Sequence, residues 1–323
     1  MRPRVVVTRR LPEEVEARLA QRFDAVLSPD DRPLAPEDLV EAIRTADALL
    51  PTVTDRLTAD VLGAAPRRAR ILANFGVGLD HVDLAAAAAN GLVVTNTPGV
   101  LTDDTADLAL TLLLMVARRA GEGERHLRAG EWTGWRPTQL LGTRVTGLTL
   151  GIVGMGRIGR AVAARARGGF GMRILYCSPR ALAPEEEARL GAERRGLEAL
   201  LAESDAVSLH CPGGPATRHL IDAPALARMR PGAFLVNTAR GQVVDEGALV
   251  DALARGAIAG AGLDVYEDEP AVHPGLLARQ DVVLLPHLGS ATTAARRAMG
   301  DLAVDNLEAF FAGEPPPDLV AGP

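Results

Sequence analysis

A glycine-rich segment in the middle of the chain constrains its fold more than any other feature. It reads G-I-V-G-M-G-R-I-G over residues 151–159. An apolar run at 149–153 leads into it, a helix-like pattern follows through Arg167, and a second apolar run covers 172–176. Strand, glycine turn, helix and strand within about 30 residues form the unit that binds dinucleotides. A lone G-x-G-x-x-G also occurs in tight structural turns, so the prediction depends on the flanking pattern.

Each glycine of this segment has a physical task in such a unit. Gly154 allows the tight turn, Gly156 lets the backbone approach a pyrophosphate, and Gly159 lets the helix pack close to the strand. The helix then begins with Arg157 and Ile158, and its first N–H groups and positive dipole end favour phosphate. The segment therefore predicts a dinucleotide site at this helix N-terminus.

Strand and helix signals alternate on both sides of this segment. With 323 residues, two domains are the natural expectation. The sequence thus predicts two doubly wound α/β domains with parallel sheets, of which the second is the Rossmann cofactor domain. A long helix is expected over 102–118, whereas 121–146 lack clear periodicity, which is typical of an arm or interface segment. The expected strands are 4–7, 25–27, 48–50, 71–74, 92–96, 149–153, 174–176, 206–209, 233–237, 260–265 and 282–285, and a last helix covers 292–312.

The composition excludes several classes of protein. The chain contains no lysine, which excludes Schiff-base lysine enzymes that use pyridoxal phosphate and ATPases with a P-loop lysine. The net charge of −6 gives no sign of a nucleic-acid or membrane partner, and the longest apolar stretch, 108–117, is far too short for a membrane span. The two cysteines form neither a disulfide framework nor a metal-binding spacing, so we expect a reducing cytoplasm and no metal.

Three further polar segments follow expected strands of the second domain, where open α/β sheets bind their ligands. They read N-T-A-R-G over 237–241, D-V-Y-E-D-E-P over 264–270 and P-H-L-G-S-A-T over 286–292. Together with the glycine segment, they occur in the order found in the D-isomer-specific 2-hydroxyacid dehydrogenases. The chain resembles that family from Asn74 to about Thr293. The runs N-T-P-G-V-L-T-D-D-T-A-D-L-A and G-E-W-T-G-W-R-P resemble its glyoxylate/hydroxypyruvate reductase branch.

This resemblance implies an activity and a domain arrangement. The enzyme would transfer a hydride from NAD(P)H to glyoxylate, hydroxypyruvate or a similar short 2-keto acid, giving the D-2-hydroxy acid. It would be a cytoplasmic homodimer without a metal. Residues 1–98 and 289–323 would form a discontinuous, flavodoxin-like substrate-binding domain, and 99–288 the Rossmann domain, with a cleft between them. Residues 99–147 would supply the dimerisation helix and arm.

The resemblance also assigns catalytic roles, and the chemistry asks for the same residue types. Arg240 suits the substrate carboxylate and ketone because a guanidinium binds carboxylate through a bidentate fork. His287 suits the proton donor, since a histidine with a pKa of about 6.5 acts as acid or base near neutrality. Glu269 would hydrogen-bond His287 and orient it. Taken singly, Arg240 could be a capping residue and Glu269 a solvated loop residue; their order along the chain favours catalysis.

Further contacts follow from the same resemblance. The backbone N–H groups of Val77 and Gly78 would bind the substrate carboxylate, although a simple glycine turn explains this loop equally well. Trp135 matches a tryptophan that reaches toward the neighbouring subunit's site, with a packed interface role as the alternative. Cofactor contacts are implied at Thr105 and Asp264 near the nicotinamide, at Thr238, and along the adenosine half at Cys211, Pro212 and Thr217.

The end of the second Rossmann strand indicates which nicotinamide cofactor binds. NAD-specific sites carry an acid there for the ribose 2′-hydroxyl, but here the strand runs into Cys177-Ser178-Pro179-Arg180 and the first acid is Glu185. Ser178 and Arg180 suit a 2′-phosphate instead. The sequence therefore favours NADP(H), with an enzyme that accepts both NADP(H) and NAD(H) as the alternative if Arg180 points to solvent.

The same motifs also occur in proteins with other functions. Formate dehydrogenases of the family carry glutamine where Glu269 stands, which argues against that activity. Phosphite dehydrogenases keep the same arginine, glutamate and histidine. A nucleotide-sensing binding protein, as in the corepressors built on this fold, is the alternative that is not an enzyme.

Overall fold

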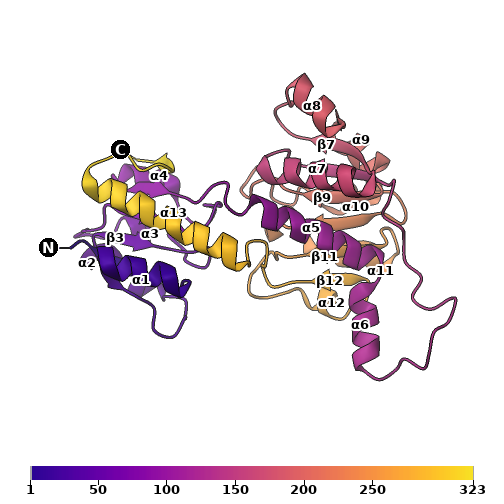
Figure 1. Cartoon of the computed structure of the whole chain (residues 1–323), viewed down its shortest axis with the longest axis horizontal. Helices are drawn as coiled ribbons and strands as arrows, with labels where there is room; N and C mark the ends of the chain where they lie inside the picture. The colour runs from indigo at the N-terminus through magenta and orange to yellow at the C-terminus, as the bar shows by residue number, and fades with distance from the viewer. Residues whose placement is uncertain (1, 323) are drawn as a thin grey trace. The chain divides into compact units, whose positions relative to one another are not determined.

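The computed structural model describes residues 2–322, which divide into two compact units (Figure 1). Unit 1 comprises the described residues up to Leu101 and from Ala291 onward, and unit 2 comprises Thr102–Ser290. No helix among the described residues combines the length and apolarity that crossing a membrane requires.

Unit 1 is a six-stranded sheet with helices on both faces. Its strand order is β13-β5-β4-β3-β1-β2, in which β1 to β5 are parallel and β13 pairs antiparallel with β5. The order 2-1-3-4-5 is that of flavodoxin-like sheets. The strands are β1 (Arg4–Val7), β2 (Asp24–Val26), β3 (Ala48–Leu50), β4 (Ile71–Ala73), β5 (Val93–Thr95) and β13 (Leu319–Ala321). The helices are α1 (Glu13–Arg22), α2 (Pro36–Thr45), α3 (Ala59–Leu62), α4 (Leu84–Ala89) and α13 (Thr293–Ala312).

Burial on both faces explains why the central strands of unit 1 read as continuous apolar runs. All residues of β3 and β4 are buried, as a parallel sheet covered on two sides requires. Helices α2, α3 and α4 contribute to one apolar cluster, whereas α13 contacts α1 and β4. Thr292 caps α13 by accepting a hydrogen bond from the N–H of Ala295.

Unit 2 is a seven-stranded, fully parallel sheet in the order β12-β11-β10-β9-β6-β7-β8. Counted from β6, this is the Rossmann order 3-2-1-4-5-6 with one more strand, and the order reverses between β6 and β9. The strands are β6 (Thr149–Val153), β7 (Arg173–Cys177), β8 (Ala192–Arg194), β9 (Ala206–Leu209), β10 (Phe234–Asn237), β11 (Gly260–Leu263) and β12 (Val282–Leu284). The helices are α5 (Thr102–Ala117), α6 (Ala120–Arg128), α7 (Arg157–Phe170), α8 (Pro184–Leu190), α9 (Leu197–Glu203), α10 (Ala223–Arg228), α11 (Glu246–Ala254) and α12 (Pro274–Leu277), with a 3-10 helix η1 at Gly241–Val243.

Two apolar clusters cover the two faces of this sheet. One joins α5 and α7 to β6 and β7, and the other joins α9, α10 and α11 to β9, β10 and β11. The prediction of two α/β units with parallel sheets is thus confirmed, with β13 as an antiparallel addition.

Three elements differ from the sequence-based expectation. The sequence shows no clear periodicity over residues 121–146, and the helix α6 that covers their first part was not predicted. This helix buries none of its residues and contains two glycines, so it has no apolar stripe that a pattern could detect. Strands β8 and β13 were not predicted either, because each has three residues and lies at a sheet edge with mostly exposed side chains.

Candidate active site

The glycine turn lies at the point where the strand order reverses. Gly154 has φ +97°, and a Cβ there would lie 2.5 Å from the backbone N of Cys211. A Cβ on Gly159 would lie 2.3 Å from the carbonyl O of Gly154, so both positions exclude a side chain. A Cβ on Gly156, in contrast, would meet no atom within 4 Å. The backbone is therefore packed tightly on the protein side and open at Gly156, which fits the approach of a pyrophosphate.

Helix α7 begins directly at this opening. Gly156 is its N-cap residue, and no side chain caps the N–H groups of the first turn, which contains Arg157, Ile158 and Gly159. A 14-residue helix whose first turn is uncapped presents free N–H groups and a positive dipole end to an anion. The residues of this turn fit the phosphates of a dinucleotide.

A histidine and a carboxylate are paired at the neighbouring strand ends. Glu269 follows β11 and His287 follows β12, and His287 Nδ1 lies 2.8 Å from Glu269 Oε2. The other carboxylate oxygen accepts the N–H of Tyr266 at 3.0 Å, which fixes the carboxylate plane. The backbone of His287 has φ +56°, and its backbone N–H donates to the backbone carbonyl of Asp264 at 2.8 Å. Its Nε2 makes no hydrogen bond to residues 2–322, so this nitrogen is available to a ligand.

The electrostatics keep Glu269 ionised. Burial raises its pKa, but the hydrogen bond to His287, the charge of that ring, the Tyr266 N–H and the charge of Arg240 together hold the pKa below its usual value. A carboxylate at this position stabilises a protonated His287. The influence of Arg240 also means that its guanidinium lies within electrostatic reach of the pair.

Arg240 sits in a turn that side chains and close packing define. The amide of Asn237 accepts the N–H of Ala239 at 3.0 Å and donates to the carbonyl of Arg240 at 2.9 Å. A Cβ on the next residue, Gly241, would lie 1.8 Å from the backbone C of Tyr266. The turn with Arg240 therefore packs directly against the loop that leads to Glu269.

Asp264 and Thr105 organise the loop that contains His287. Asp264 is buried and accepts the N–H groups of Leu288 and Gly289 at 2.6 and 2.8 Å. Burial raises its pKa against the effect of these bonds. Thr105 donates to the carbonyl of Gly289 at 2.9 Å. Both side chains are thus engaged with this loop, and their contact with a nicotinamide stays a prediction.

The expected adenosine side gathers at the ends of β6, β7 and β9. The N–H of Gly154 donates to the carbonyl of Cys177 at 2.8 Å, directly before Ser178. The hydroxyl of Thr217 donates to the carbonyl of Pro212 at 2.7 Å, which closes the loop after Cys211. Burial raises the pKa of the Cys211 thiol to about 11, so it stays protonated at neutral pH.

Thr238 and Arg180, two further residues expected to bind the cofactor, lie in different surroundings: one is buried and the other is exposed. Thr238, after β10, has a buried hydroxyl without a hydrogen-bond partner among the described residues, which fits a polar ligand. Arg180 is exposed, and it makes no ion pair or hydrogen bond within residues 2–322.

Sequence reasoning missed Arg194 on β8. Its Nη2 donates to the carbonyls of Ser178 and Pro179 at 3.0 and 3.1 Å. No pattern could have placed it there, because β8 itself was not predicted and only the sheet pairing brings it beside β7.

Unit 1 contains the predicted substrate loop with Val77 and Gly78, which follows β4. The Asn74 amide donates to the carbonyls of Gly76 and Gly78 at 3.0 and 3.1 Å, and Asn96 donates to the carbonyl of Val77 at 2.9 Å. These bonds hold the loop carbonyls, whereas the N–H groups of Val77 and Gly78 have no acceptor among the described residues. The loop can therefore bind an anion, and its role toward the substrate stays a prediction.

Trp135 lies in the irregular segment after α6, and 82% of it is exposed. His126 Nδ1, on α6, lies 2.8 Å from Oε2 of Glu131 in this segment. The role of Trp135 stays a prediction. Within residues 2–322, no group of three histidine, cysteine or acidic side chains is arranged to hold a metal ion.

Comparisons with known proteins identify relatives of this chain. The family profile "D-isomer specific 2-hydroxyacid dehydrogenase, NAD binding domain" matches residues 110–289. The chain is 50% identical to glyoxylate reductase of Thermococcus kodakarensis over 99% of this chain and 96% of that protein. It is also similar to the structure of an NADPH-dependent glyoxylate/hydroxypyruvate reductase of Sinorhizobium meliloti in complex with NADP and malonate, with TM-score 0.88, 38% identity and coverage of 99% and 97%. A D-mandelate dehydrogenase of Rhodotorula graminis gives TM-score 0.87, 31% identity and coverage of 99% and 97%.

Proposed function

The chain belongs to the D-isomer specific 2-hydroxyacid dehydrogenase family, and from this premise we propose that it reduces glyoxylate or hydroxypyruvate with NADPH. It is a nicotinamide-dependent dehydrogenase whose relatives are named for these two substrates. The observation that supports the proposal most is the pair formed by His287 and Glu269, 2.8 Å apart, beside Arg240. A dehydrogenase that reduces a ketone needs this set of an acid, its supporting anion and a cation.

The residues divide the work as follows. Arg240 binds the substrate carboxylate through its planar fork and polarises the ketone. His287 holds a proton on Nε2 and delivers it to the ketone oxygen as that oxygen becomes an alkoxide. Glu269 keeps the ring oriented through Nδ1 and stabilises its protonated form before transfer. The nicotinamide nucleotide, when bound, supplies the hydride.

The cofactor would be held at the carboxyl ends of the unit 2 strands. The first turn of α7 would bind the pyrophosphate, and the unpartnered hydroxyl of Thr238 would contact another polar group of the nucleotide. The preference for NADPH over NADH is supported by the lack of an acid directly after β7 and by Ser178 and the unpaired Arg180 there.

Turnover assays test this proposal. We expect fast loss of nicotinamide absorbance with NADPH and either glyoxylate or hydroxypyruvate, and slower loss with NADH. His287→Ala should lower kcat by at least about 100-fold, a typical general-acid contribution, while the Kd for NADPH stays close to that of the wild type. Loss of NADPH binding in that variant, or no turnover of any 2-keto acid by the wild type, would contradict the assignment.

We further propose that the chain forms a homodimer through α6 and the segment up to residue 147. Support comes from the large apolar side chains exposed there, which a partner would cover: Leu127, Trp132, Trp135 and Leu141. Light scattering after size exclusion would test it, and a monomer at micromolar concentration would contradict it. The substrate-binding role of unit 1 and the cytoplasmic location stay predictions.

A further inference from the structure

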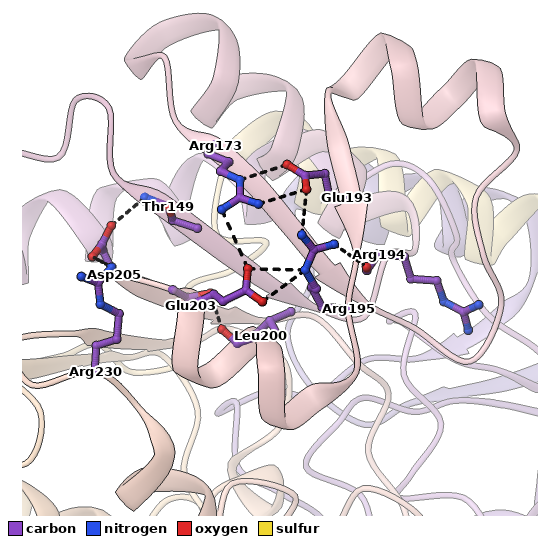
Figure 2. Close-up of polar contacts among 10 residues, drawn as sticks. Thr149, Arg173, Glu193, Arg194, Arg195, Leu200, Glu203, Asp205 and Arg230 are labelled. Atoms are coloured by element: carbon purple, nitrogen blue, oxygen red, sulfur yellow. Dashed lines mark hydrogen bonds and ion pairs between the residues drawn. The ribbon is translucent and has the colours of Figure 1, made fainter.

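Strand β8 presents its side chains to two different surroundings. Glu193 and Arg195 join an ion-pair network with Arg173 and Glu203, in which Glu193 lies 2.9 Å from Arg173 and 2.8 Å from Arg195. Arg194, between them, points away from this network, as strand alternation requires (Figure 2). The network thus pairs Glu193 and Arg195, the residue directly after the strand, and does not include the Arg194 side chain.

The Arg194 guanidinium contacts the turn that follows β7. One nitrogen, Nη2, donates to both Ser178 O and Pro179 O, at 3.0 and 3.1 Å. This holds the guanidinium over the turn that follows β7. Its Nε and Nη1 make no hydrogen bond or ion pair with residues 2–322 and are free to donate to a ligand.

Two arginines without a carboxylate partner therefore belong to this turn: Arg194 contacts it, and Arg180 is part of it. Within residues 2–322, neither Arg180 nor Arg194 pairs with a carboxylate. Four other arginines, on α7, α8 and β7 and directly after β8, do so: Arg160 and Arg189 with Glu186, and Arg173 and Arg195 with Glu193. The Arg194 guanidinium, which backbone carbonyls hold in place, is suited to a dianionic oxyanion such as phosphate, and the exposed Arg180 adds a second positive charge to the turn.

The turn adjoins the nucleotide-binding backbone. Ser178 follows Cys177, whose carbonyl accepts the N–H of Gly154 from the glycine turn at 2.8 Å. Burial raises the pKa of the Cys177 thiol, and the charge of Arg194 opposes that rise, so the guanidinium acts on the end of β7. In a Rossmann unit, this strand end lies beside the ribose 2′ position.

We propose that Arg194 is a binding residue for the 2′-phosphate of NADP(H), in addition to Ser178 and Arg180. This inference rests on the proposed preference for NADPH and names an edge strand as a further determinant of it. The Nε and Nη1 groups of Arg194 would donate to the phosphate while Nη2 keeps the turn in place.

The test compares the binding of two nucleotides that differ only in the 2′-phosphate. Isothermal titration of the full chain with adenosine 2′,5′-bisphosphate and with 5′-AMP gives both affinities without turnover. In Arg194→Gln, we expect about a tenfold loss of bisphosphate affinity, since a charge-assisted hydrogen bond is removed, and less than about a twofold change for AMP. Arg194→Lys should keep part of the bisphosphate affinity, because it keeps the charge. The matched control is Arg228→Gln, which removes a guanidinium that pairs with Glu198 on α9.

Each other outcome overturns the proposal in a distinct way. Equal losses for both nucleotides would mean that Arg194 only supports the turn. Unchanged binding in Arg194→Gln would remove it from the site. A wild type that binds both nucleotides equally would overturn the NADPH preference together with this inference, whereas reduction of glyoxylate would still stand.

Discussion

Replacing Glu269 with glutamine tests the proposed acid most directly. The wild-type carboxylate accepts two hydrogen bonds, one on each oxygen: His287 on Oε2 and the N–H of Tyr266 on Oε1. An amide of the same shape has only one oxygen, so its NH₂ group must face one of these two donors. If the amide oxygen turns to Tyr266, the NH₂ group faces His287 Nδ1 and the protonated ring loses its partner.

The size of the effect follows from this geometry. A hydrogen bond to a charged group contributes about 1.5–3 kcal/mol, and the lower end applies because His287 and Glu269 keep 30% and 32% of their side chains exposed. A loss of about 1.5–2 kcal/mol in transition-state stabilisation lowers kcat/KM by roughly 10–30-fold.

The assay is the initial rate of NADPH oxidation with glyoxylate at neutral pH, together with the Kd for NADPH. Glu267→Gln is the control, since that carboxylate pairs with Arg218 and His219 rather than with His287. A Glu269→Gln variant with wild-type kcat/KM would refute the pairing as part of the reaction.

Three further outcomes are expected. Gly154→Ala should lower the free energy of unfolding by about 1–3 kcal/mol and abolish NADPH binding, because its Cβ would lie 2.5 Å from the backbone N of Cys211. Gly168→Ala is the control: a Cβ there meets nothing within 4 Å, so thermal melts and NADPH titrations should show neither effect. Arg240→Lys should raise KM for the keto acid and lower kcat, with NADPH binding intact, because an ammonium lacks the planar fork; wild-type kinetics would remove Arg240 from the site. The hydrogen bond to Arg173, reinforced by Arg195, lowers the pKa of Glu193 to about 2 against the effect of burial. The ionised Glu193 therefore stabilises the fold above pH 4.5, the pKa of the unfolded state, and this stabilisation is lost as the pH falls toward 2. In urea unfolding, Glu193→Gln should lower the free energy of unfolding by less than about 1 kcal/mol at neutral pH and leave it unchanged near pH 2.

Much of the fold could be predicted because its signals are local. Strands such as β1, β3, β6 and β9 begin and end at the expected residues, since apolar runs bounded by turn residues depend on neighbours in the chain. Helix α6 and the edge strands β8 and β13 could not be predicted. They bury little, so their conformation depends on partners that are distant in sequence.

The candidate site divides in the same way. The glycine turn is a local motif, and its three glycines have in the structure the close packing and the opening that the spacing requires. The chemistry of Arg240, Glu269 and His287 could be named from residue type and order. Their roles remain predictions, but the 2.8 Å contact between the last two comes from two loops that follow neighbouring strands.

The sequence by itself determined that this chain alternates strand and helix, turns on a glycine fingerprint and contains the family's polar motifs in order. Only the tertiary structure decided which of these residues meet. In the structure, Asp264 accepts hydrogen bonds from the N–H groups of Leu288 and Gly289. The pairing of β7 with β8 places Arg194 within hydrogen-bond distance of the carbonyl of Ser178. The physical reason is that hydrophobic periodicity and turn chemistry depend on residues that are close in the sequence. Parallel strands, in contrast, are joined by long crossover connections, so their pairing brings together side chains that are far apart in the sequence.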